Sequence, residues 1–241
     1  MNPFERCIEK EKLILELLRD ETFSNVENVG LHLQIRRNSA YTTLKRMEKK
    51  GLVQQHYIQW KIAQSGRLSI WGLTSKGSFS LPDDGHCRHY SANRVSIHTI
   101  EHSLEIQKAK IFALRAGWRD WVSSRKVYQI AHQEPSIWPQ IPDALATSPQ
   151  GERMAIELER TAKGTLRYRN ITENYCQMFF DRTVNRVVYI CSENIKSSVE
   201  KRLLSPTEIF LNGRINKFNE SFKNRFAFTT IEGWEQDAQS F

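Results

Sequence analysis

Residues 141–163 read IPDALATSPQGERMAIELERTAK, and a strong turn signal, Ser-Pro-Gln-Gly, lies in the middle of this stretch. After the turn the side chains alternate: Met, Ile and Leu fall on one side, while Ala155, Glu157 and Glu159 fall on the other. This period of two is typical of a β-strand with one apolar face. The stretch therefore predicts a hairpin whose second strand carries two acids on one side.

The first arm of the hairpin supplies a third acid, Asp143. A turn centred on 149–150 would place Asp143 opposite position 156, with Glu157 as its near neighbour across the hairpin. The carboxylates of Asp143, Glu157 and Glu159 are then expected to converge on one face.

Three carboxylates that converge without partners would strongly raise the pKa of at least one of them. A bound divalent cation removes that conflict, and ligands that are all oxygen suit Mg²⁺ or Mn²⁺. Such an ion can activate water and neutralise the charge that builds up on a phosphodiester. The alternative is an exposed strand whose acids pair with the basic neighbours Arg153, Arg160 and Lys163. The residues alone leave both interpretations open.

The bulk composition indicates a globular protein with an anionic partner. The chain has 241 residues, enough for two small domains, with 39% hydrophobic and 26% charged residues. Its formal net charge is +8, and the sequence pI is about 9.4. An excess of this size favours a polyanion but does not distinguish DNA from RNA or an anionic membrane.

Several patterns predict a cytoplasmic protein without membrane insertion. No apolar run approaches the roughly 20 residues that span a bilayer. The first residues, MNPFER, lack the basic-then-apolar order of a signal peptide. The four cysteines contain no CxxC pair and are expected to be reduced thiols.

The first eighty residues predict three helices followed by a hairpin. The helices are expected at 6–19, at 26–33 and from the turn at 34–36 to Lys50, and the strands at 52–60 and 68–73. This order is typical of a winged helix-turn-helix, in which the third helix enters the major groove of DNA.

The segments YTTLKRMEKKGLV and RLSIWGLTSKG also resemble MarR- and PadR-like winged-helix proteins. We therefore expect a DNA-binding domain at 1–80, with the hairpin along the backbone or minor groove. The alternative is a solvated basic face on a module that mediates dimerisation. The residues expected to reach bases or phosphates are Arg36, Arg37, Asn38, Tyr41, Thr42, Lys45 and, at the tip of the wing, Arg67.

Residues 81–95 are rich in Pro, Asp, Gly and Ser and are expected to be a linker. Within it His86, Cys87 and His89 are too crowded for a usual zinc site, and a loop with chance ligands is the preferred interpretation. A long helix is expected at 95–116. Its histidines, His98 and His102, are more typical of packing or surface positions than of a metal site, and their role stays open.

The acidic hairpin carries a family resemblance. PDALA followed by AIELERTAK resembles the core of PD-(D/E)xK nucleases, in the variant where the second acid-x-Lys becomes acid-x-acid. The order of winged helix, HSLE helix, PDA, ELERT and a helix with Tyr175 is similar to the replication-relaxation family, whose MobC-type members are relaxases of mobilisable plasmids. The likeness extends to the late strand RVVYICS and the terminal RFAFTTIEGW, and so spans nearly the whole chain.

This resemblance implies an α/β (α+β) protein with a restriction-endonuclease-like domain at 96–241, built on a mixed central sheet. It implies a relaxase that nicks one strand of double-stranded DNA at a plasmid transfer origin with Mg²⁺ or Mn²⁺, helped by an accessory or coupling protein. Asp143, Glu157 and Glu159 match the catalytic, metal-binding acids of the family. Lys163 stands four residues past Glu159, away from the position of the usual lysine, and is at most a catalytic helper.

Other functions stay open from the sequence. One is a winged-helix regulator of transcription or replication with a non-catalytic nuclease-like domain, and another is a dimeric restriction-type endonuclease. A relaxase with histidine-bound metal is disfavoured because no His-hydrophobe-His triplet occurs. Water is the simpler nucleophile beside an acid-bound metal, but the sequence leaves a covalent tyrosine adduct open.

Overall fold

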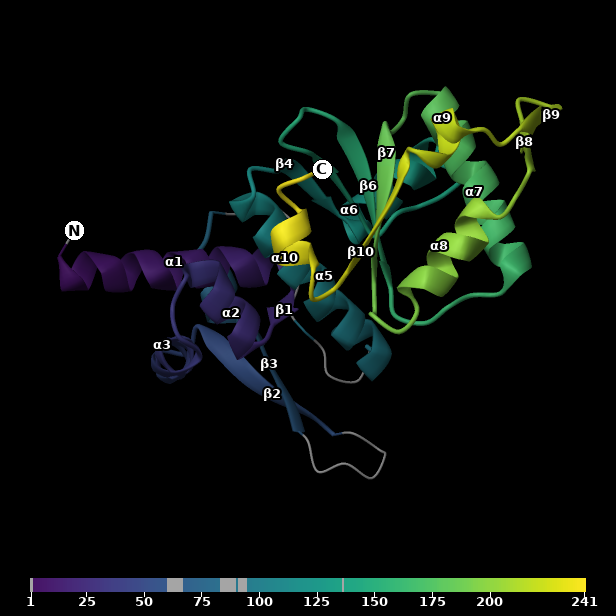
Figure 1. Cartoon of the computed structure of the whole chain (residues 1–241). Helices are drawn as coiled ribbons and strands as arrows, with labels where there is room; N and C mark the ends of the chain where they lie inside the picture. The colour runs from purple at the N-terminus through teal and green to yellow at the C-terminus, as the bar shows by residue number, and fades with distance from the viewer. Residues whose placement is uncertain (1, 60–66, 83–89, 91–94, 136) are drawn as a thin grey trace. The chain divides into compact units, whose positions relative to one another are not determined.

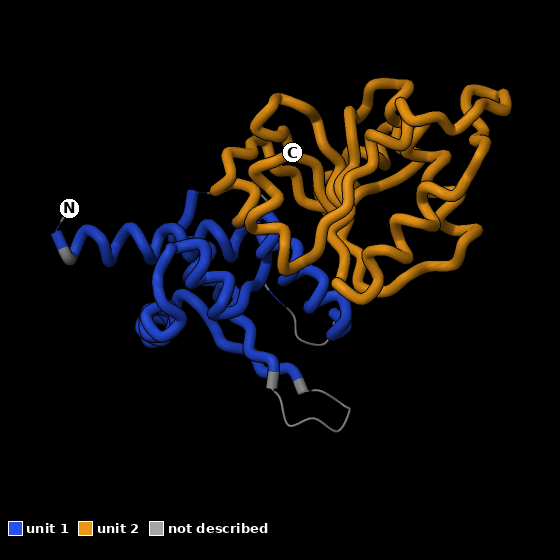
Figure 2. Tube along the Cα trace, in the orientation of Figure 1, with its two compact units in different colours: residues 1–111 blue, residues 112–241 orange. Residues whose placement is uncertain are grey.

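The computed structural model of the protein describes residues 2–59, 67–82, 90, 95–135 and 137–241 (Figure 1). The tip of the predicted wing and the histidines and cysteine at 86–89 lie outside the described residues. The chain forms two compact units, 1–111 and 112–241 (Figure 2). The division falls inside helix α5 (Ile97–Arg115), later in the chain than the domain boundary that composition suggests.

The first unit combines helices with a small antiparallel sheet. Strand β3 lies in the middle of this sheet, between β1 and β2. The three helices and the hairpin predicted from the sequence are confirmed, within a few residues at each end. The elements are α1 (Pro3–Glu21), β1 (Phe23–Ser24), α2 (Val26–Leu33), α3 (Arg37–Lys49), β2 (Val53–Gln59), β3 (Arg67–Leu73) and α4 (Ser75–Phe79).

Helix α3 packs on this unit through the apolar stripe predicted for it. Ala40, Leu44 and Met47 are each 0% exposed, as their spacing of four and three requires for one helix face. At the C-terminal end of α3, Arg46 and Lys50 donate hydrogen bonds to Glu11 of α1. Two of the basic side chains near the end of α3 thus fix the helix to α1.

Helix α5 is joined to the rest of the first unit by buried hydrogen bonds. The side-chain amide of Asn28 donates to the backbone oxygen of Leu104 over 2.8 Å. In return, the side-chain amide of Gln107 donates to the backbone oxygen of Phe23 over 2.8 Å. These bonds satisfy buried polar groups and set the position of α5 along α2 and β1.

The second unit contains a five-stranded mixed sheet in the order β10-β7-β6-β5-β4. Strand β5 runs antiparallel to both of its neighbours, β4 and β6, whereas β6, β7 and β10 are parallel. The α/β class expected from the sequence is confirmed. The strands are β4 (Arg119–Ser123), β5 (Ala144–Thr147), β6 (Arg153–Glu159), β7 (Arg186–Cys191) and β10 (Phe226–Thr230).

One face of this sheet is covered by helices α6 (Ser124–Gln133), α7 (Thr165–Phe180) and α8 (Lys196–Leu204) (Figure 1). Between α8 and β10 the chain forms the two-stranded hairpin of β8 (Glu208–Leu211) and β9 (Arg214–Lys217), followed by the short helix α9 (Glu220–Lys223). Helix α7 is the main partner of the sheet, because most of its buried side chains belong to the core cluster on this face.

The last short helix, α10 (Trp234–Asp237), returns the chain to the start of the second unit. The indole N–H of Trp118 donates to the backbone oxygen of Ala238 over 2.7 Å, and the rings of Trp118 and Trp234 meet edge to face. No helix among the described residues combines the length and the apolar character needed to cross a membrane.

The predicted acidic hairpin is confirmed, but its register was wrong by one residue. Ala144 pairs with Ile156, so Asp143, which directly precedes β5, comes opposite Glu157 and not opposite position 156. The reason lies in the turn, where the N–H of Ser148 donates to the oxygen of Glu152 and closes a longer loop than assumed.

Candidate functional site

Two carboxylates meet where β5 begins and β6 approaches its end. The register brings Asp143 and Glu157 onto the same face of the sheet. The negative charge of Asp143 raises the pKa of Glu157. The backbone N–H of Leu158 donates to Oδ2 of Asp143 over 2.9 Å. Asp143 is therefore held against β6 by a peptide group next to its acidic neighbour. The two acids are neighbours across the hairpin as predicted, although they stand directly opposite one another and not one residue apart.

Glu157 is partly buried under helix α7. The hydroxyl of Tyr175 and the side-chain amide of Gln140, the latter over 3.0 Å, donate to the same carboxyl oxygen, Oε1. Burial and then the charge of Asp143 raise the pKa of Glu157 to about 8, although the two hydrogen bonds act in the opposite direction. At neutral pH this carboxyl therefore carries a proton that a nearby cation would displace.

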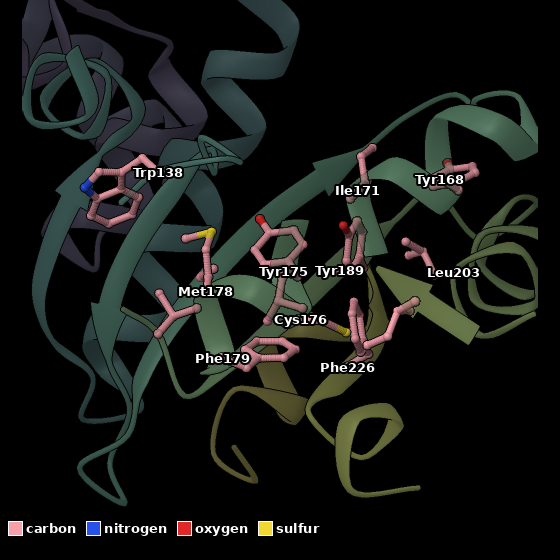
Figure 3. Close-up of a cluster of buried hydrophobic side chains, with 14 of the residues drawn as sticks. Trp138, Tyr168, Ile171, Tyr175, Cys176, Met178, Phe179, Tyr189, Leu203 and Phe226 are labelled. Carbon is pink, nitrogen blue, oxygen red and sulfur yellow. The ribbon is translucent and has the colours of Figure 1, made fainter. Parts of the chain in front are cut away.

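A second tyrosine lies beside Glu157 on the same face. Tyr189 pairs with Glu157 across the parallel strands β6 and β7. Figure 3 shows its hydroxyl pointing in the same direction as that of Tyr175. The Tyr189 hydroxyl is buried and has no hydrogen-bond partner among the described residues. Burial, followed by the charge of Glu157, raises the pKa of Tyr189 well above its ordinary value, so it remains a protonated donor beside the acid.

The third predicted acid has a different environment. Glu159 is 5% exposed and forms an ion pair with the ammonium of Lys163. The hydroxyl of Tyr168 also bonds to Glu159, and it accepts the backbone N–H of Lys163 over 3.1 Å. Arg202 in turn donates to the backbone oxygen of Lys163. This arrangement fixes the loop after β6 and neutralises Glu159 in place.

The three acids therefore do not converge as expected: Asp143 and Glu157 form a pair, and Glu159 has its own ion pair with Lys163. Within the described parts of the chain, no three His, Cys, Asp or Glu side chains gather closely enough to hold a metal ion. Asp143 and Glu157 alone still fit a hard cation, since Mg²⁺ is often held by one or two carboxylates with water completing its shell. The ammonium of Lys163 forms its ion pair with Glu159, and its positive charge also lowers the pKa of Glu157.

The predicted DNA-contacting residues of α3 fall into two groups. Arg36, Asn38 and Thr42 are exposed, and Tyr41 is 42% exposed. Arg37 is exposed as well, but its guanidinium forms an ion pair with Glu27 of α2 over 2.6 Å. This part of α3 therefore presents cations and hydrogen-bonding groups to solvent.

Lys45 has a more structural environment than predicted. Its ammonium bonds to Glu48 over 2.8 Å and to Gln55 of β2 over 2.7 Å, and lies over the ring of Trp71. It thus links α3 to the base of the hairpin. Arg67, predicted at the tip of the wing, begins β3, and the structure describes only its backbone.

The histidines of α5, His98 and His102, belong to the part of that helix in the first unit. His98 is exposed. Sequence reasoning missed Gln140 and Tyr189 at the acidic pair. A usable signal for Gln140 was its position three residues before Asp143, between two prolines.

Comparisons with known proteins give no family for the chain. No protein-family model matches it, and no curated protein matches it. A solved structure described as PigF with SAH is similar at 12% sequence identity, covering 94% of this chain and 62% of that chain, with a TM-score of 0.22. A TM-score this low does not indicate a common fold, and this similarity carries no conclusion about function.

Proposed function

We propose that the protein is a DNA relaxase that binds a plasmid transfer origin and nicks one strand in a reaction that depends on Mg²⁺ or Mn²⁺. The observation that carries this proposal is the pair of Asp143 and Glu157 on neighbouring strands, with a Glu157 pKa of about 8. Ionising both carboxyl groups is unfavourable in the protein alone, and a divalent cation between them would stabilise the doubly ionised form. The family resemblance of the acidic hairpin supports the same chemistry.

The first unit supports the DNA-binding half of the proposal. Three helices followed by an antiparallel hairpin suit a winged helix-turn-helix, in which α3 would lie in the major groove. Arg36, Asn38 and Tyr41 are exposed on α3 or at its start, as that role requires. The chain's net charge of +8 favours binding to the phosphate backbone.

In this proposal Asp143 and Glu157 would hold the cation, which supplies an activated water and neutralises charge on the phosphodiester. The Leu158 N–H holds Asp143 in place, and Tyr175 holds Glu157. Glu157 must release its proton when the cation binds, so binding strengthens as the pH rises. Glu159 joins the set only if the Lys163 ammonium moves away from it, which leaves Lys163 as a helper.

A second candidate is a DNA-binding regulator whose second unit has no catalytic role. The ion pair between Glu159 and Lys163 favours it, because a carboxylate already neutralised by an ammonium has no need of a metal. In that case the first unit would bind DNA in the same way.

One assay separates these functions. Supercoiled plasmid that carries the DNA region neighbouring the protein's own gene is incubated with protein and Mg²⁺ or Mn²⁺, with Asp143→Ala as the matched variant. We expect open circles from the unchanged protein only, and equal gel-shift affinity for both proteins. Linear product would indicate a double-strand endonuclease. Intact supercoiled DNA with a normal gel shift would support the regulator and contradict the relaxase.

A further inference from the structure

We propose that Gln140 is a positioning residue, which orients the carboxyl group of Glu157 toward Asp143 and the cation between them. This inference rests on the proposed metal-dependent function. It starts from an observation outside the acidic hairpin: the side-chain amide of Gln140 donates to Oε1 of Glu157 over 3.0 Å. Gln140 is on the segment between α6 and β5, so the contact joins a connecting segment to an internal strand.

The segment around Gln140 is fixed on both sides. Trp138 is 6% exposed within the core cluster of the second unit. The side-chain amide of Asn174 on α7 donates to the backbone oxygen of Pro139 over 3.0 Å. Pro139 and Pro142 also restrict the backbone immediately around Gln140, because each proline ring locks its own φ. The amide is therefore presented to Glu157 from a backbone with little freedom to move.

The hydrogen bonds also distinguish the two oxygens of Glu157. Gln140 and Tyr175 both donate to Oε1, from different elements of the fold. Neither donor takes Oε2, which leaves that oxygen for the shared site with Asp143. Groups that hydrogen-bond to a metal ligand from outside set its orientation, and losing one typically weakens metal binding or activity by about 10- to 100-fold.

The test compares Gln140→Leu with Gln177→Leu, which removes the same side chain from a position away from the acids. Gln177 lies on α7, where it donates to Asp181 over 2.8 Å and accepts from the N–H of Asn212. Mn²⁺ binding is measured by electron paramagnetic resonance on the whole protein without DNA. We expect about tenfold weaker Mn²⁺ binding for Gln140→Leu and unchanged binding for Gln177→Leu. Equal Mn²⁺ affinity in Gln140→Leu and the unchanged protein would overturn the inference.

A second measurement works even if Gln140→Leu folds poorly or the unchanged protein binds no Mn²⁺. The side-chain amide signal of Gln140 is followed by two-dimensional NMR in the unchanged protein and in Glu157→Ala. We expect the signal to move in Glu157→Ala and also when Mg²⁺ is added to the unchanged protein. Movement in Glu157→Ala without a response to Mg²⁺ would support the contact but contradict the metal-dependent function. If the amide signal of Gln140 does not move in Glu157→Ala, the proposed role of Gln140 is overturned.

Discussion

Tyr175, which is fully buried on α7, donates a hydrogen bond from its hydroxyl to Glu157 on β6. The ring of the same tyrosine packs against Phe179 at a centroid distance of 6.1 Å and against Phe226 at 6.2 Å. One end of Tyr175 therefore belongs to the hydrophobic core and the other to the acidic pair. The position of the proposed catalytic carboxyl consequently depends on how well this core is packed.

Tyr175→Phe tests this link, because it removes the hydroxyl and keeps the ring. The hydrogen bond from Tyr175 lowers the pKa of Glu157, so its loss should raise that pKa further and make the carboxylate harder to form. We expect nicking near neutral pH to fall about tenfold, with the activity profile displaced to higher pH. The measurement is the initial rate of nicking against pH at fixed Mn²⁺. Tyr128→Phe, at a 52% exposed position on α6, is the control. An unchanged pH profile in Tyr175→Phe would contradict the link.

Glu157→Gln should change the pH dependence of stability. The folded protein holds the Glu157 proton up to a pKa of about 8, whereas the unfolded chain loses it near the ordinary value of 4.5. Between these values the folded state binds more protons, so the free energy of unfolding falls as pH rises, by up to about 1.4 kcal/mol per pH unit. The glutamine side chain does not titrate, so Glu157→Gln should escape this loss. It should be more stable than the unchanged protein near pH 8.

Thermal unfolding at several pH values in metal-free buffer measures this effect. The stability of Glu157→Gln relative to the unchanged protein should increase from pH about 5 to about 8, and this difference should disappear below the ordinary carboxyl pKa. Glu193→Gln, at an exposed position, serves as the control and should show no such trend. A constant difference between Glu157→Gln and the unchanged protein at all pH values would rule out the proton as its cause.

Arg37 and Glu27 should affect DNA binding in opposite directions. Arg37→Ala removes a cation from the start of α3, and we expect weaker binding and a salt dependence reduced by about one counterion. Glu27→Gln removes the acid that pairs with Arg37 and should strengthen binding at low salt. The measurement is fluorescence anisotropy over a salt series. Lys12→Ala on α1 is the control for lost charge. An Arg37→Ala variant with the original salt slope would exclude Arg37 from the interface.

Lys163→Met should destabilise the second unit, because Glu159 would lose its ammonium partner while staying 5% exposed. Breaking a buried pair costs about 3–5 kcal/mol, and the partial exposure of Lys163 reduces our expectation to about 2 kcal/mol. Urea unfolding gives this value. If the acids bind a cation, added Mn²⁺ should restore part of the loss by binding the folded state.

The control for Lys163→Met is Lys12→Met. The Lys12 side chain is 69% exposed and that of its partner Glu16 is 35% exposed, so the loss of this pair should cost less than about 0.5 kcal/mol. A destabilised Lys163→Met protein with no response to Mn²⁺ would argue against metal binding at this cluster. It would instead favour a purely structural role for the ion pair.

Much of the first unit could be predicted because its signals are local. Helix α2 was predicted with its observed bounds, since Asn25 caps it and its apolar residues share one face. In the second unit β4 was missed. Asp120 has a left-handed backbone conformation at φ 54°, and the pairing of β4 with β5 shifts register nearby. An irregular strand of this kind has no clear period of two in its sequence.

The candidate site was predictable only as far as its strands. The alternation in 153–159 predicted the common face of Glu157 and Glu159. The alternative interpretation, in which the acids pair with basic neighbours, anticipated the ion pair of Glu159 with Lys163. Gln140 reaches Glu157 from 17 residues away, and this contact is set by the packing of the connecting segment. Tertiary contacts of this kind leave no periodic pattern in the sequence.

The hydrogen bond between Trp118 and Ala238 has a consequence for biosynthesis. It joins residues at opposite ends of the second unit, and the parallel strand β10 also comes late in that unit. Until the ribosome has released residues 226–238, β7 lacks its outer neighbour and Trp118 lacks its acceptor. If α3 binds DNA as proposed, a nascent chain that already carries α3 can meet DNA before the unit bearing the acidic pair has folded. Under the same proposal, proteins truncated before β10 should still bind DNA while lacking the completed sheet.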